Sequence, residues 1–329
     1  LAAQAAGAFD IDRALQTLGG YTTAHLADLI ARAVCQAVHL ALPERGGAEN
    51  PAEWLGRVLR AAGDHLGEHR LLVILDELDM LLDALREGRA EELVFYNLRA
   101  VMKQLPTYRW LLILQDSFFY ERHNRASVNA VLQECRDLHL LPLDSTWADK
   151  LIREPSESQG IHYDDDFLPG VIHDLTGGSP YLIKAVCFNL VNQAREQGRT
   201  VITHRDLDRA RGYMVSEGGR YFNHYFKYLS GEGNGVLMTL SQASDENDWV
   251  AEEELLTRLD SLSLGLTERI VRRELKRLAS QGLVERRSQP RAEVRFSVRL
   301  FYDYMRTHYD SEIDLRGSAA PAGESGGAK

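Results

Sequence analysis

Residues 71–77 read LLVILDE, five apolar residues followed by two carboxylates. An apolar run of this length predicts a strand that is buried on both faces, as in a parallel sheet. Asp76 and Glu77 stand where that strand would end, and open α/β sheets bind their ligands at the carboxyl ends of parallel strands. The stretch therefore predicts an α/β fold with a binding site at this edge. The simpler interpretation is a strand that two polar residues merely terminate.

The sequence around this strand alternates between helical and strand-like patterns. Apolar residues at three- and four-residue spacing predict helices, and short apolar runs predict strands. The expected helices are 22–42, 52–66 and 87–104, and the expected strands are 70–75, 108–114 and 138–143. Asp144 and Ser145 are suited to cap the helix that follows. Strands that alternate with helices predict a parallel sheet over residues 7–143.

After residue 144 the pattern becomes helical and then changes again. Residues 145–228 predict several short helices, one starting at Pro180 and one capped by Thr203 with Asp206. From residue 233 onward, three helices precede two strand-like segments, which is the element order of a winged helix. The predicted domains are 1–144 (α/β), 145–230 (helical), 231–310 (winged helix) and 311–329 (a disordered polar tail).

Composition excludes several classes of protein. The 329 residues carry a net charge of −10, and 44% of them are hydrophobic, as in ordinary globular domains. No apolar run approaches the roughly 18–20 residues that span a bilayer, so no membrane partner is expected. The three cysteines lie far apart, which predicts reduced thiols in a cytoplasmic protein. The acidic balance argues against a protein that coats nucleic acid with its whole surface.

Four motifs follow one another along the chain: LLVILDELD at 71–79, LLILQDS at 111–117, LPLDSTWADKLIREP at 141–155 and TGGSPYLIKAVC at 176–187. Together they resemble the AAA+-like P-loop ATPase core of the STAND class, including its archaeal-type and novel-STAND branches. In that class they correspond to Walker B, sensor 1, the link into the lid, and the G-x-P motif of the lid. The resemblance covers residues 7–309. It implies a parallel-sheet core, a helical lid and a winged helix, a layout shared with origin-binding initiator ATPases.

The resemblance implies catalytic roles at the ends of the first two strands. Asp76 would hold Mg²⁺ through its coordinated waters, and Glu77 would orient the water that attacks the γ-phosphate of ATP. Gln115, or as a weaker candidate Ser117, would sense that phosphate by hydrogen bonding. Signalling members of the class often carry an Arg in sensor 1, so Gln115 is a departure. Its alternative role is that of a satisfied polar group at a strand end.

The resemblance also implies that Gly178 and Pro180 line the adenine end of the ATP pocket. The alternative is a loop residue and a helix start with no ligand. The histidines show no metal-ligand spacing with one another or with cysteine, and no Ser-His-Asp or Cys-His pattern stands out. ATP and Mg²⁺ are therefore the cofactors that the sequence predicts.

The phosphate-binding motif G-x-x-x-x-G-K-[ST] is absent from the 329 residues. The opening residues predict the end of a helix at 1–6 and a short strand at 8–11, and in P-loop proteins a helix follows the Walker A loop directly. We therefore expect the glycine-rich loop to lie just upstream of Leu1. ATP binding by this chain alone is expected to be weak or absent, because the backbone cradle and lysine that hold the phosphates are missing.

The expected winged helix has an excess of positive charge, unlike the rest of the chain. Residues 269–299 hold ten basic and three acidic side chains. A basic third helix and a basic wing are typical of proteins that bind duplex DNA. Arginine is also favoured in protein interfaces, so an internal or protein-facing role stays open. The candidate contacts are Arg269, Arg272, Arg273, Lys276, Arg286 and Arg287.

Two functions of different classes follow. The favoured one is a regulatory ATPase switch, in which the state of the γ-phosphate changes how the lid and winged helix pack. Its output would be homo-oligomerisation on activation, or release of an effector domain or protein outside this chain. The alternative is a winged-helix DNA-binding protein, initiator-like or regulatory, with a degenerate ATPase core. A non-catalytic scaffold is a third option.

Overall fold

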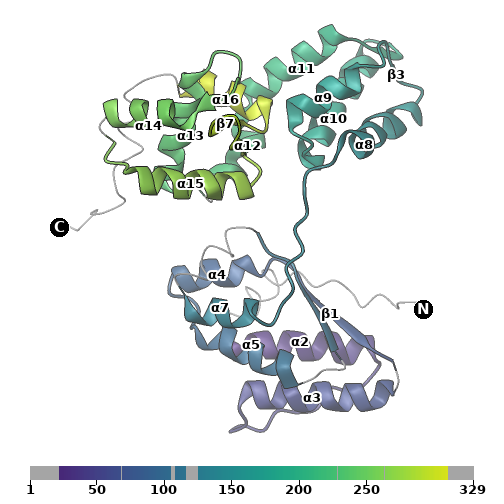
Figure 1. The fold of residues 1–329 in the computed structure, drawn as a ribbon. Helices are drawn as coiled ribbons and strands as arrows, with labels where there is room; N and C mark the ends of the chain where they lie inside the picture. The colour runs from purple at the N-terminus through teal and green to yellow at the C-terminus, as the bar shows by residue number, and fades with distance from the viewer. Residues whose placement is uncertain are drawn as a thin grey trace, which may run out of the picture. The chain divides into compact units, whose positions relative to one another are not determined.

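The computed structural model describes residues 22–67, 69–104, 108–115, 125–227, 229–262 and 264–309. The chain divides into two compact units, Leu1–Leu138 and His139–Lys329 (Figure 1). The predicted helix at 1–6, the predicted strand at 8–11, Ser117 and the predicted tail at 311–329 lie outside the described residues. No helix in the described part of the chain is long and apolar enough to cross a membrane.

The helices of the first unit start at residues that cap them. Thr22 accepts a hydrogen bond from the backbone N–H of His25, and Asn50 accepts one from that of Ala52, with Pro51 in the first helical position. The described helices are α2 (Thr23–Ala37), α3 (Pro51–Leu66), α4 (Asp79–Arg86), α5 (Leu93–Gln104) and α7 (Ala126–Leu132). The first two predicted helices are confirmed. The third begins later than expected, at Leu93, and α4 precedes it.

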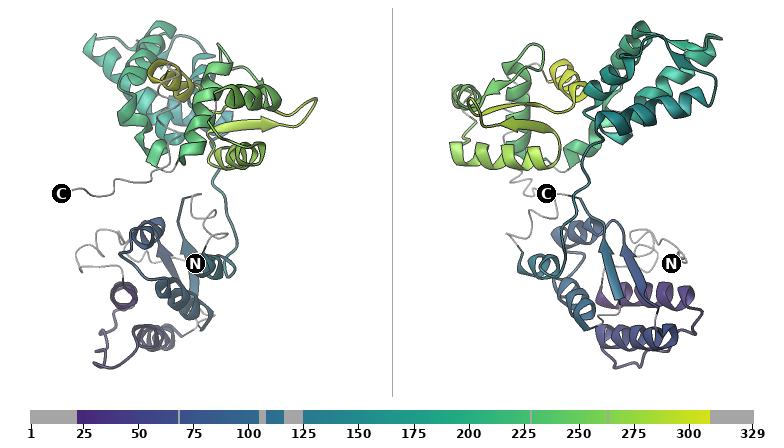
Figure 2. Two further views of the ribbon diagram at one scale, coloured as in Figure 1. Left: turned by 90° about the vertical axis from the view of Figure 1, so that its left-hand side faces the viewer. Right: turned by 45° about the vertical axis from the view of Figure 1, so that its right-hand side comes forward.

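Two parallel strands form the sheet of the first unit. They are β1 (Leu71–Leu75) and β2 (Tyr108–Leu112), paired in register from one end to the other and drawn side by side in Figure 2. The pairing continues past the strands, since Ile113 donates to the carbonyl of Leu75 at 2.8 Å. The prediction that these two segments are parallel strands is confirmed.

Among the residues that the structure describes, helices cover only one face of this sheet. Val73, Leu75 and Tyr108 are buried in a core shared with α2, α3 and α5, and the Tyr108 hydroxyl donates to the Leu59 carbonyl at 2.5 Å. On the other face Leu72 and Ile74 are 50% and 51% exposed. The prediction that this strand is buried on both faces is therefore wrong for the described structure, because the helices of the core pack against one side.

The predicted third strand at 138–143 is also wrong. This segment makes no strand pairing with any residue that the structure describes, and three of its four leucines are exposed, Leu140 by 92%. A strand needs a neighbour to satisfy its backbone groups, and apolar composition alone does not supply one. The segment ends instead at Leu143, whose N–H donates to the carbonyl of Gly178 at 2.9 Å.

The second unit begins with five helices and one pair of two-residue strands. They are α8 (Ser145–Glu157), β3 (His162–Tyr163), α9 (Leu168–Thr176), α10 (Pro180–Glu196), β4 (Val201–Ile202), α11 (His204–Ser216) and α12 (Gly218–Lys227). The predicted caps are confirmed. Asp144 accepts from Trp147 N, Pro180 opens α10, and Thr203 with Asp206 forms a full capping box. We call α8–α12 the helical subdomain.

The rest of the second unit has the predicted order of three helices and a hairpin. Its elements are α13 (Gly231–Ala243), β5 (Val250–Ala251), α14 (Glu252–Ser261), α15 (Glu268–Ser280), β6 (Val284–Arg287), β7 (Glu293–Phe296) and α16 (Arg299–His308). The strands form an antiparallel sheet in the order β5-β7-β6. Strand β5 and helix α16 were not predicted. We call α13–α16 with this sheet the winged-helix subdomain.

The two subdomains share one hydrophobic core, which runs from Ala148 to Met305. Helix α16 of the winged-helix subdomain packs against the helical subdomain. Phe301 packs on Phe222 of α12, with ring centroids 5.4 Å apart, and Asp303 pairs with Arg211 of α11. Gly177, at the end of α9, also lies so close to the winged helix that an added Cβ would stand 2.5 Å from the Ser297 carbonyl oxygen. The helical and winged-helix subdomains are therefore built as a single packed body.

Candidate functional site

Three polar residues lie at the carboxyl edge of the β1–β2 pair. Asp76 and Glu77 follow β1 directly, and Gln115 stands three residues past the end of β2. Because the strands are parallel and in register, Leu75 opposite Leu112, their ends reach the same edge. All three side chains are exposed. The structure thus brings together the predicted carboxylates and the predicted sensor on one side of the sheet.

Glu77 has an unusual backbone. Its φ is +54°, in the left-handed region that favours glycine. The conformation costs an L-residue with a Cβ roughly 1–2 kcal/mol. The turn is stabilised locally, since the N–H of Glu77 donates to Oδ1 of Asp76 at 2.9 Å. Strained residues of this kind concentrate at functional sites, where the surrounding structure holds them in place.

The residues after Glu77 anchor this turn. Leu78 is completely buried, and its N–H donates to the Ile113 carbonyl at 3.1 Å, which ties the turn to the end of β2. Asp79 is 5% exposed and opens helix α4. Asp76 and Glu77 are therefore presented to solvent from a backbone that is fixed on its inner side.

The carboxylates suit Mg²⁺ better than a metal held by protein ligands alone. The described residues contain no group of three or more His, Cys, Asp or Glu side chains arranged to bind a metal. Mg²⁺ keeps several waters and is commonly held by one or two carboxylates together with substrate phosphates. Two exposed carboxylates at a strand end fit that donor set.

Gly178 and Pro180 lie in the second unit, at the start of α10. Gly178 has φ +72°, and an added Cβ would stand 2.4 Å from the Leu143 carbonyl oxygen. That same oxygen lies 2.9 Å from Nε2 of His173. Pro180 is exposed and occupies the first position of α10, after the N-cap Ser179. Close packing therefore explains the glycine and helix initiation explains the proline, whether or not a ligand is present.

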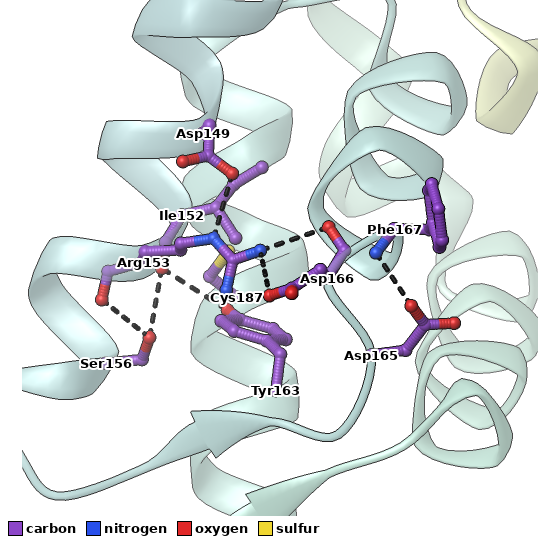
Figure 3. Close-up of polar contacts among 9 residues, drawn as sticks. All are labelled: Asp149, Ile152, Arg153, Ser156, Tyr163, Asp165, Asp166, Phe167 and Cys187. Carbon is purple, nitrogen blue, oxygen red and sulfur yellow. Dashed lines mark hydrogen bonds and ion pairs between the residues drawn. The ribbon is translucent and has the colours of Figure 1, made fainter.

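The helical subdomain also contains a polar cluster that the sequence did not reveal (Figure 3). Arg153 bridges Asp149 and Asp166, with an Nε–Oδ1 distance of 2.9 Å to the former. The Tyr163 hydroxyl donates to the Ile152 carbonyl at 3.3 Å and lies 3.8 Å from Sγ of Cys187. Burial raises the pKa of the Cys187 thiol to about 11, which keeps it protonated and unreactive at neutral pH. This cluster braces β3 against α8 and α10.

The predicted basic contacts divide between two elements. Arg269, Arg272, Arg273 and Lys276 lie on α15 and line an open surface hollow of about 1010 Å³. Arg286 and Arg287 lie on β6, where each pairs with a buried glutamate, Glu252 and Glu293 respectively. The six residues therefore differ in how their charges are compensated, although their sequence positions gave no sign of it.

Comparison with known proteins was made at the level of sequence and of structure. No family model and no curated protein sequence matches the chain. The ORC2 protein of Aeropyrum pernix, solved in ADPNP–ADP complexes, superposes with a TM-score of 0.58 over 92% of this chain and 76% of its own, at 18% identity. A Walker-type ATPase of Pyrococcus abyssi gives 0.57 over 91% and 83%, at 11% identity.

The chain resembles this ORC2 protein and this Walker-type ATPase in fold. At these identities the likeness concerns the fold alone. It includes both units, since the superpositions cover more than nine-tenths of the chain. The expected AAA+-like architecture is confirmed to that extent, with small sheets in the described residues.

Proposed function

We propose that this chain is the core of a nucleotide-dependent regulatory ATPase. The observation that carries the proposal is the set of polar residues at one edge of the parallel strands, Asp76, Glu77 and Gln115, within an AAA+-like fold. Ligands of open α/β sheets bind at that edge. The structurally similar ORC2 protein was solved with ADPNP and ADP, which supports a nucleotide as the ligand here.

Each residue at the edge has a role in this proposal. Asp76 holds the hydration shell of Mg²⁺, which when bound supplies charge neutralisation at the phosphates. Glu77 accepts a hydrogen bond from the attacking water and orients it. Gln115 donates its amide N–H to the γ-phosphate and thereby distinguishes ATP from ADP. The left-handed backbone of Glu77 supports this assignment, because a glycine would satisfy the turn at lower cost but would supply no carboxylate.

Binding of the phosphates needs a further element. The 329 residues contain no G-x-x-x-x-G-K-[ST] motif, so these residues by themselves bind nucleotide weakly. Gly178 and Pro180 are assigned to the adenine end of the pocket. This role is compatible with their structural roles at the start of α10, where Gly178 is buried and Pro180 is exposed.

The switch acts through the second unit as a whole. The helical and winged-helix subdomains share a core and are tied by Arg211 and Asp303, so repacking between them would break this pair and open the core. Nucleotide state therefore acts on the combined body and leaves the packing of its two subdomains against each other unchanged. This modifies the simpler expectation that the lid and winged helix repack against each other.

Nucleotide binding by the protein's complete gene product tests the proposal. Replacing Asp76 by Asn should weaken Mg²⁺-ATP binding at least tenfold in a calorimetric titration and leave ATP binding in EDTA unchanged. Replacing the nearby Asp83 by Asn is a matched control, since Asp83 pairs with Arg86 on α4. Equal affinity of the Asp76 variant and the wild type for Mg²⁺-ATP would remove the assignment.

A second function is duplex DNA binding by the winged helix. It is favoured by the four cations that line the hollow along α15. Phosphate contacts of this kind make affinity fall steeply with salt concentration. Neutralising Arg272, Arg273 and Lys276 together should abolish binding of a short duplex in fluorescence anisotropy. No duplex binding by the wild-type chain even at low salt would exclude this function.

A further inference from the structure

The arginines of the wing are occupied inside the protein. Two nitrogens of Arg286 lie 2.6 and 3.0 Å from Oε1 of Glu252, which is 2% exposed. Arg287 and Arg291 share Glu293, which is 3% exposed, with Nε of Arg291 2.7 Å from Oε1. Removing all arginine partners of a buried carboxylate leaves a charge without compensation in the core. These contacts are therefore part of the fold.

The remaining arginine of the hairpin is also engaged. Arg295 pairs with Glu285 on the neighbouring strand at 2.9 Å. Arg287 and Arg295 both stack on the indole ring of Trp249, with guanidinium-to-centroid distances of 4.5 and 4.8 Å. Cations stacked on an aromatic face and paired with carboxylates have little capacity left for an external anion. The wing is a charge-compensated surface.

Helix α15 is different. Arg269 and Lys276 are exposed and make no ion pair or hydrogen bond with any residue that the structure describes. Arg272 pairs only with the exposed Glu268, within its own helix. Arg273 is 61% exposed and touches Glu274, whose carboxylate already contacts Arg277 and Ser230. The positions i, i+3, i+4 and i+7 place these four cations along one face of the helix.

The chemistry of this face indicates what it binds. Among the described residues, every large apolar side chain that is strongly exposed lies between Leu72 and Tyr213, outside the winged-helix subdomain. Protein interfaces depend on buried aromatic and aliphatic anchors, and single-stranded nucleic acids are held by stacking on exposed aromatic rings. Helix α15 offers neither. A surface of cations alone suits the phosphate backbone of a duplex.

We propose that α15 alone makes the duplex contacts of this winged helix and that the wing serves as an internally paired support. This rests on the duplex-binding function proposed above and deepens it. The exposed face of α15 has no Asn or Gln between Glu268 and Ser280. We assign the four cations to about four phosphates. Arg and Lys also contact guanine edges, so equal binding of two duplexes of unrelated sequence distinguishes phosphate contacts from base contacts. The slope of log affinity against log salt is then about −3.6, at roughly −0.9 per phosphate.

The test compares two variants that each remove two positive charges. R269Q/K276Q neutralises the two unpaired cations of α15 and breaks no contact in the described residues. R291Q/R295Q neutralises two wing arginines and leaves Arg287 on Glu293. Binding of two unrelated 20-base-pair duplexes is measured by fluorescence anisotropy between 50 and 200 mM salt, after thermal unfolding has confirmed that both variants are folded.

The expected result is that R269Q/K276Q weakens binding at least tenfold for both duplexes. The slope of log affinity against log salt should become shallower by the contribution of about two phosphates, equally for both duplexes. R291Q/R295Q should stay within twofold of wild type. Equal loss in the two variants would overturn the inference while leaving duplex binding intact. Absence of duplex binding by the wild type would overturn both, and binding of an acidic polypeptide such as polyglutamate in its place would identify a protein partner.

Discussion

Arg211 and Asp303 form a two-point ion pair between helices α11 and α16, with Nε–Oδ2 and NH2–Oδ1 distances both 2.7 Å. The pair joins the helical subdomain to the winged-helix subdomain at residues separated by more than ninety positions in sequence. Its planar geometry fixes both position and orientation. Together with the shared hydrophobic core, this ion pair makes the second unit a single packed body.

Replacing Asp303 by Asn should lower the free energy of unfolding of this unit by about 1 kcal/mol, because a charge-assisted pair becomes a weaker hydrogen bond at a partly exposed site. Urea unfolding measures the change. Asp245→Asn is the control, since Asp245 is almost fully exposed and lies 3.5 Å from Arg306. In both proteins the second unit should still unfold in one transition, followed by hydrogen exchange of the backbone amides of α8–α16. Separate transitions of the helical and winged-helix subdomains in the wild type would contradict a single body.

Gly177→Ala should be more damaging than its backbone angle alone explains. Gly177 has φ +58°, and a Cβ there would stand 2.5 Å from a backbone oxygen of Ser297. We expect a loss of about 3 kcal/mol or more, combining left-handed strain with overpacking. Gly198→Ala is the matched control, because φ is +64° and no atom lies within 4 Å. Its expected loss is about 1 kcal/mol. Equal losses in thermal melts would argue against the close contact.

Glu77→Gly should stabilise the first unit by about 1 kcal/mol, since glycine adopts φ +54° without strain. Gly88→Ala, in the same unit at φ +72° and in open space, should show the opposite sign and a similar size. Denaturant unfolding of both variants checks this. A Glu77→Gly protein less stable than wild type would mean that the carboxylate is held for folding rather than for chemistry.

Much of the fold follows from local sequence signals such as helix caps and apolar runs. The caps at Asn50, Asp144 and Thr203 are read within four residues, and so were predictable. Strands β1 and β2 were predictable because each is a short apolar run followed by polar residues. The segment 138–143 has the same composition but no neighbouring strand in the described structure. Sequence pattern carries no information on pairing partners, so this prediction failed.

The candidate site shows the same division. Asp76, Glu77 and Gln115 were predictable because polar residues after parallel strands must share an edge. The approach of Leu143 to Gly178 was not predictable, because it depends on tertiary packing. For the same reason, the sequence did not show which basic side chains pair with buried glutamates. Arg286 and Lys276 look alike in sequence, and only the buried Glu252 distinguishes them.

The pH dependence of stability should reflect Asp206. Hydrogen bonds from Arg199, joined by those of Thr203, hold the pKa of this carboxyl well below its ordinary value, despite burial. A depressed pKa in the folded state stabilises the fold above the ordinary value of about 3.9, and that contribution is lost as pH falls further. Wild type and Asp206→Asn should therefore differ by about 2 kcal/mol at pH 7, and the difference should begin to shrink below about pH 4.

Urea unfolding of these two proteins between pH 3 and 7 measures the difference directly. The Asp245→Asn variant serves as a control, since Asp245 is almost fully exposed and lies 3.5 Å from Arg306. A constant gap between wild type and Asp206→Asn across this range would show that the carboxyl does not titrate as its contacts imply.

The proposed role of Glu77 is to orient the water that attacks ATP. The most direct measurement is ATP turnover by the complete gene product with Glu77→Gln, in parallel with ATP affinity. Glutamine keeps the size of the side chain but accepts hydrogen bonds less strongly. Turnover should fall at least a hundredfold while ATP affinity stays within about threefold, so that nucleotide remains bound unhydrolysed. Unchanged turnover in this variant would contradict the account.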